Sequence, residues 1–82
     1  MKTHKIKLSD EFANDVLLGN KTFEIRYNDR NYKVGDYIEF VVVGENKEPV
    51  EHMLNEVPYK ITYVLSGWGL QDGYVALGIQ RI

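Results

Sequence analysis

The densest group of polar side chains lies in the first third of the chain. Lys21 and Arg26 supply hydrogen-bond donors and positive charge, and Glu24 supplies an acceptor between them. Arg26 could bond a phosphate or carboxylate through two parallel hydrogen bonds, and Glu24 could accept from the exocyclic amine of a base. With Asn28 and Arg30 just downstream, the group predicts a cleft that holds a phosphate together with a base edge. The alternative is a solvated ladder of salt bridges on an exposed strand.

Aromatic side chains could complete such a site by stacking on a base. Trp68, flanked by glycines, and Tyr74 are the candidates that we assign to it, with Tyr27 and Tyr32 as further possibilities. The alternative for each is a place in the core, which takes most aromatic residues of a small domain.

Metal and thiol chemistry have little support. The chain has no cysteine, and its two histidines, His4 and His52, are far apart in sequence. His4 lies on the apolar side of an alternating segment, which favours a hydrogen-bonded core histidine over a catalytic base. We therefore expect no metal and no cofactor.

The elements that position these residues follow from periodicity. Residues 3–8 alternate as a half-buried strand, with His4, Ile6 and Leu8 on one side. Ser9 is a good N-cap for a helix that Gly19 then ends, because glycine readily adopts the left-handed conformation. Residues 22–28 alternate again, and the pattern predicts a core face and a charged face; the core face is Phe23, Ile25 and Tyr27, and the charged face is Thr22, Glu24, Arg26 and Asn28.

Three further β-rich runs complete the chain, at residues 37–43, 59–65 and 74–79. Residues 44–55 form a long connection or a short irregular helix around 50–54. Together these elements predict an α+β domain: a small, mostly antiparallel β-barrel of about five strands with one N-terminal helix. The 82 residues suffice for one domain, residues 1–82, with one core.

Charge and hydropathy limit the partners. The net charge of -2 argues against a protein that coats nucleic acid by bulk electrostatics. Residues 1–33, however, hold seven basic and five acidic side chains, whereas the remainder holds three and seven, so an anion would be steered toward the N-terminal third. No apolar run is long enough for a signal peptide or a membrane span, so we expect a cytoplasmic protein that does not contact membranes.

The run Gly19-Asn20-Lys21-Thr22-Phe23-Glu24-Ile25-Arg26 resembles the Gly-x-Lys-Thr-x-Glu-x-Arg signature of ASCH domains, and Val34-Gly35-Asp36 resembles the turn that follows it. The stretch from His4 to Arg30 is similar to a subfamily of small uncharacterised bacterial and phage proteins of the DUF3850 kind. The resemblance covers residues 3–42 well, the final strands moderately and residues 44–56 poorly. It implies a PUA-like fold and RNA or a nucleotide-like ligand as partner.

The same resemblance suggests an enzymatic alternative, because some small ASCH proteins remove the acetyl group from N4-acetylcytidine with a lysine, a threonine and a glutamate. Lys21 matches that lysine, but Glu24 occupies the threonine position, and the segment that would carry the catalytic glutamate is shortened or absent. Thr22 carries a hydroxyl two residues from that position, on the same strand face as Glu24, and could replace the missing nucleophile. Lys21 and Glu24 could instead form a proton-transfer pair if they are buried, and these two are the catalytic candidates.

A third interpretation is an adaptor that binds another protein through the acidic residues 45–56. Exposed sheet edges are compatible with a monomer or a weak homodimer.

Overall fold

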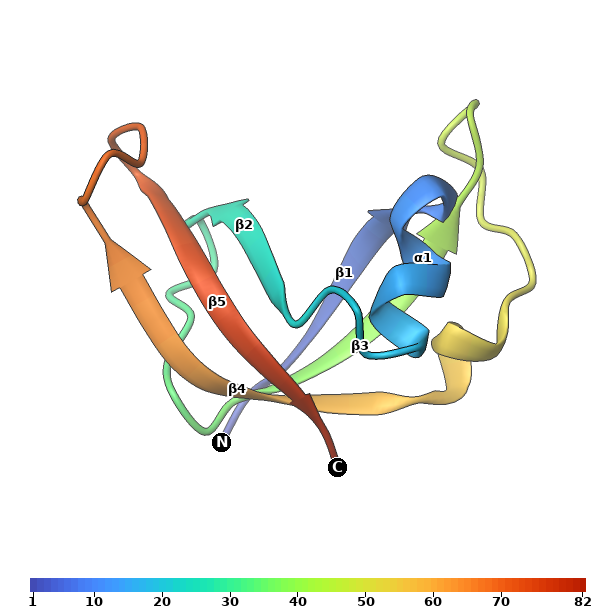
Figure 1. The fold of residues 1–82 in the computed structure, drawn as a ribbon, viewed down its shortest axis with the longest axis horizontal. Coiled ribbons are helices and arrows are strands. Elements are labelled where there is room, and N and C mark those ends of the chain that lie inside the picture. The colour runs from blue at the N-terminus through green and yellow to red at the C-terminus, as the bar shows by residue number, and fades with distance from the viewer.

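The computed structural model describes all 82 residues and contains one helix and a five-stranded sheet. The strands are β1 (Thr3–Ser9), β2 (Phe23–Tyr27), β3 (Tyr37–Val43), β4 (Pro58–Ser66) and β5 (Tyr74–Arg81), with α1 (Asp10–Leu17) and a 3₁₀ turn, η1 (Met53–Glu56). Their order in the sheet is β1-β3-β4-β5-β2. Figure 1 shows the sheet curled into a trough, with the β4–β5 loop at the upper left and α1 on the right.

The α+β class, the five strands and the early helix are confirmed, but the closed barrel is wrong. β1 pairs with β3 in parallel, the other three pairings are antiparallel, and β1 and β2 remain as the two edges of an open sheet. A side chain links these edges instead of a backbone ladder, because Nη2 of Arg26 on β2 donates to the carbonyl oxygen of Lys7 on β1 at 2.6 Å. Arg26 thus bridges two edges that a closed barrel would join by backbone hydrogen bonds.

Local signals set the ends of α1 as expected. The Ser9 side chain accepts from the backbone N–H of Glu11, and Asp10 and Glu11 lie at the positive end of the helix. Beyond the helix, Gly19 has a φ of +82°, which a residue with a Cβ rarely adopts.

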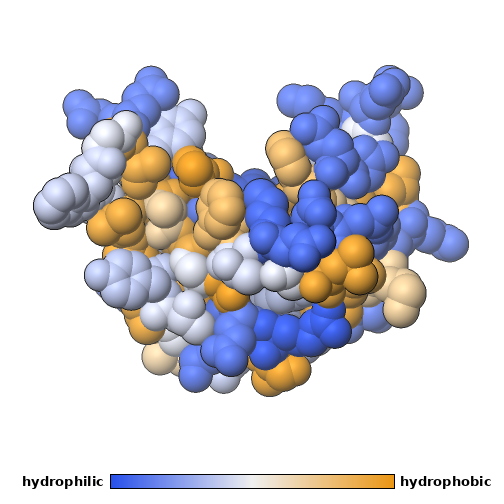
Figure 2. All heavy atoms as spheres, viewed as in Figure 1, coloured by the Kyte–Doolittle hydropathy of each residue, from blue (hydrophilic) through white to orange (hydrophobic).

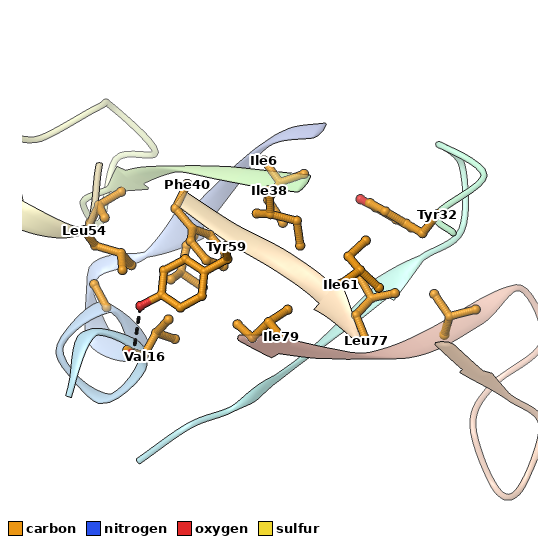
Figure 3. Packing of buried hydrophobic residues seen from close by; sticks show 14 residues of the cluster. Ile6, Val16, Tyr32, Ile38, Phe40, Leu54, Tyr59, Ile61, Leu77 and Ile79 are labelled. Carbon is orange, nitrogen blue, oxygen red and sulfur yellow. Dashed lines mark hydrogen bonds between the residues drawn. The ribbon is translucent and has the colours of Figure 1, made fainter. Parts of the chain in front are cut away.

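The core fills the concave side of the sheet and is covered at one end by α1 and η1 (Figure 3). Ala13 and Val16 of the helix and Leu54 of η1 are buried there. The hydroxyl of Tyr59 on β4 donates to the carbonyl oxygen of Val16 at 3.3 Å, which ties the helix to the sheet. The helical turn in the connection after β3, η1, thus lies slightly later than the predicted 50–54, and it contributes Leu54 to the core.

The two faces of β2 are the reverse of the prediction. Phe23, Ile25 and Tyr27 are 47%, 51% and 57% exposed, whereas Glu24 on the opposite face of the strand is only 2% exposed. The three exposed residues pair with Gly78, Ala76 and Tyr74 of β5. Alternation separates two faces but does not say which one is buried, and two cations make the inward glutamate tolerable here.

Candidate functional site

The site begins with Glu24, whose carboxylate binds two cations of its own segment. Oε1 accepts from Nε of Arg26 at 3.1 Å and from Nη2 at 2.8 Å, while Oε2 pairs with the ammonium of Lys21. A buried carboxylate costs free energy unless it is paired and hydrogen-bonded, and this one is both. The three residues predicted from sequence therefore do lie together, and both carboxylate oxygens of Glu24 bind side chains of the same chain.

Lys21 is also engaged within the chain. Its ammonium donates to the carbonyl oxygen of Phe23 at 2.8 Å and lies 4.9 Å from the ring centre of Phe23 and 5.4 Å from that of Phe12. Cations at these distances from aromatic faces are attracted to them. Neither Lys21 nor Glu24 lines the cleft that Arg26 enters.

That cleft, which we call the basic cleft, lies between the edge strands β1 and β2 and has a volume of about 590 Å³. Four cationic side chains line it against a single carboxylate, that of Asp29; the cations are Lys5, Lys7, Arg26 and Arg30. Lys5, Lys7 and Arg30 make no ion pair within the chain. The cleft therefore concentrates positive charge that the protein itself leaves unneutralised, in a molecule of net charge -2.

Two tyrosines add aromatic and hydroxyl character to the basic cleft. Tyr27 and Tyr32 both line it, and the hydroxyl of Tyr32 makes no hydrogen bond within the chain. Burial raises the pKa of Tyr32, an effect that the positive charges of Arg26 and Arg30 oppose. Its hydroxyl thus stays protonated near neutral pH and can donate to an anion.

Two of the remaining predicted site residues, Asn28 and Tyr74, line a second hollow beside the loop that joins β4 to β5. Trp68 belongs to this loop but does not line the hollow. Oδ1 of Asn28 accepts from the backbone N–H of Tyr32 at 3.0 Å, so this side chain also shapes the turn after β2. The indole of Trp68 is 89% exposed.

Lys5 and Lys7 were not predicted as site residues. They alternate with the buried residues of β1, and a lysine on the outward side of a strand is ordinarily solvated. The basic excess of the N-terminal third was the only signal in the sequence, and it named no residue.

His4 belongs to a buried pair outside the basic cleft. Its Nε2 lies 2.8 Å from Oδ2 of Asp36, and its ring centre lies 4.7 Å from that of Tyr32. The carboxylate of Asp36 also accepts from the backbone N–H groups of Lys2 and Lys33. The structure confirms the hydrogen-bonded core histidine that the sequence favours. The His4 ring of this pair packs against the ring of Tyr32.

The Asp36 carboxylate should make stability depend on pH. Its pKa lies below the ordinary value, chiefly because of the hydrogen bond with His4. The stabilisation is therefore present above the unfolded pKa of about 4 and is lost as the pH falls through the lower folded value. We expect Asp36→Asn to cost about 1 to 3 kcal/mol near neutral pH, because buried donors lose a charged acceptor. Urea unfolding of both proteins across the acid range should show this difference narrowing below about pH 4; a constant difference would contradict the assignment.

Comparison with known proteins assigns the family. The model of a domain of unknown function, DUF3850, matches residues 3–79, which is nearly the whole chain. The chain belongs to the DUF3850 family. The crystal structure of the hypothetical protein PH0355 shares the fold of this DUF3850 domain, with a TM-score of 0.63 and 21% identity over 100% of both chains. No curated protein matches it.

The DUF3850 domain contains no helix that is long and apolar enough to cross a membrane. Its described residues also include no group of three or more potential metal-ligating side chains of the His, Cys, Asp or Glu type.

Proposed function

We propose that this DUF3850 domain binds RNA or a nucleotide-like ligand by holding a phosphate group in the basic cleft. The observation that carries the proposal is the convergence of Lys5, Lys7, Arg26 and Arg30 on one hollow between two sheet edges. Lysine and arginine are the side chains that bind phosphate, and a volume of about 590 Å³ suits a ligand of nucleotide size.

In this proposal Glu24 acts through Arg26. The carboxylate holds Nε and one end of the guanidinium, and the Lys7 carbonyl holds Nη2 as well, so Arg26 is oriented before the ligand arrives. Such preorganisation lowers the entropic cost of binding. Its other terminal nitrogen, Nη1, makes no hydrogen bond within the chain and is the donor that we assign to the phosphate.

The resemblance of residues 19–26 to the ASCH signature supports the same function. An ASCH-like, PUA-like relationship would account for a small curled sheet with a charged strand beside a helix end, and PUA-like domains imply an RNA ligand. Binding is also favoured over hydrolysis of a modified nucleoside, because the ammonium of Lys21 is committed to Glu24 and the Phe23 carbonyl.

A two-dimensional amide NMR titration tests the proposal. The labelled protein is titrated with inorganic pyrophosphate, with the four ribonucleoside monophosphates and with a short single-stranded RNA, at one low ionic strength. We expect saturable shifts at residues 5–7 and 26–32 that weaken as salt is added, since phosphate contacts are salt-dependent. Absence of saturable shifts with all of these ligands would overturn the proposal. The result would then favour the alternative of an adaptor that binds a protein partner through the acidic segment 45–56.

A further inference from the structure

A second hollow adjoins the basic cleft. This hollow, which we call the hairpin pocket, has a volume of about 430 Å³ and lies between the end of β2 and the loop that joins β4 to β5. Tyr27 lines both it and the basic cleft. In the same view as Figure 1, the surface on the β4–β5 side carries exposed hydrophobic residues (Figure 2). A ligand held in the basic cleft therefore has a neighbouring hollow within reach past one shared aromatic ring.

Aromatic rings form part of the hairpin pocket. Tyr27 and Tyr74 both line it, with ring centres 5.4 Å apart at an angle of 72°. Tyr27 lies directly against Gly73: a Cβ added to this glycine would be 2.6 Å from Cε1 of the tyrosine, and the glycine φ is +85°. The loop thus requires glycine here for Tyr27 to take its place. Rings fixed in this way are suited to contact the face of a planar base.

Polar side chains with free hydrogen-bonding groups line the same pocket. Gln71 and Asp72 are exposed and make no side-chain hydrogen bond within the chain, and the amide nitrogen of Asn28 donates to no protein group. These three supply both donors and acceptors, which is what the edge of a nucleobase requires. An apolar peptide segment would leave them unpaired, at a cost in free energy.

The β4–β5 loop adds a third aromatic residue, Trp68, whose backbone conformation is unusual. It has a φ of +52° between Gly67 at +73° and Gly69 at +89°, and both Gly67 and Leu70 line the hairpin pocket. A bulky residue with positive φ is a genuine outlier, and such backbone strain is found preferentially at functional sites. Trp68 itself does not line the pocket, but it is the most exposed aromatic residue of the molecule and follows Gly67, which does.

We propose that the hairpin pocket is a nucleobase subsite that reads the base of the nucleotide whose phosphate lies in the basic cleft. This inference rests on the proposed function and assigns the two parts of the nucleotide to different elements. The cations between β1 and β2 bind the phosphate, whereas the β4–β5 loop and the end of β2 select the base. Phosphate contacts position a nucleic acid and base contacts specify its sequence.

Two variants and a matched control test this subsite. Trp68→Ala removes the loop aromatic, and Gln71→Ala with Asp72→Ala removes its hydrogen-bonding groups. Tyr63→Ala is the control, because Tyr63 is an exposed aromatic residue of β4 that lines neither hollow. Each protein is titrated with pyrophosphate and with the four nucleoside monophosphates by amide NMR, and circular dichroism checks that each is folded.

We expect nucleotides to shift the amides of residues 66–74 as well as those of the basic cleft, and pyrophosphate to shift only the latter. Trp68→Ala should weaken nucleotide binding about 5-fold or more while leaving pyrophosphate affinity unchanged. The Gln71 and Asp72 variant should alter the order of preference among the four bases.

The outcomes separate the two proposals. If pyrophosphate and nucleotides all fail to bind the wild type, the phosphate site itself is wrong, and the subsite falls with it. If pyrophosphate and nucleotides bind the basic cleft equally, with no shifts at residues 66–74 and no effect of either variant, the nucleobase subsite alone is overturned.

Discussion

Glu24→Ala is expected to lower the free energy of unfolding by about 3 to 5 kcal/mol, because it leaves the two cations that this carboxylate binds without their partner. The loss is large since Glu24 is buried and contacts Lys21 and Arg26 at once, and since Arg26 also joins β2 to β1. Urea denaturation followed by circular dichroism gives the free energy directly.

The control for Glu24 is Glu39→Ala on β3, an exposed glutamate with no ion pair, which should change stability by no more than about 0.5 kcal/mol. If Glu24→Ala does not fold, Glu24→Gln, which keeps the shape and one acceptor, provides an intermediate measurement. Equal effects of the Glu24 and Glu39 variants would show that the ion-paired cluster does not hold the sheet edges together.

Removing the three unpaired cations of the basic cleft should have the largest effect on binding. We expect the combined variant Lys5→Gln, Lys7→Gln and Arg30→Gln to weaken single-stranded RNA binding by about tenfold or more. The slope of log affinity against log salt concentration should become shallower by about 0.7 for each phosphate that the variant no longer neutralises. All three side chains are exposed and unpaired, so the fold should tolerate their removal. Fluorescence titrations at several salt concentrations provide both quantities.

Lys33, Lys47 and Lys60, changed together to glutamine, form the matched control, because none of them lines the basic cleft and the change in net charge is the same. A control that loses as much affinity as the cleft variant would mean that net charge alone governs binding. The cleft would then have no specific role.

Several elements of this protein could be predicted from local signals. The strand at β3 was expected at its observed bounds, and the caps at Ser9 and Gly19 placed α1 correctly. These features depend on neighbouring residues only. An N-cap needs a hydroxyl beside the first turn, and glycine adopts the left-handed conformation readily because it lacks a Cβ. The resemblance of the stretch from His4 to Arg30 to DUF3850 proteins likewise led to the family that the comparison shows, whereas the ASCH relationship of residues 19–26 stays a prediction.

The long-range arrangement was decided only by the tertiary structure. Periodicity separated Glu24 from Phe23 and Ile25 but assigned the wrong face to the core, because hydrophobicity alone could not show that Lys21 and Arg26 would neutralise a buried carboxylate.

The basic cleft has the same origin. Lys5 and Lys7 come from β1 and Arg26 and Arg30 from β2 and the turn after it, and these elements become neighbours only because the sheet curls without closing. Sequence by itself determined which residue types were present and approximately where each short element lies. Which face is buried, and which charges share a cleft, depended on pairings between distant strands, since burial and electrostatic attraction act through space and not along the chain.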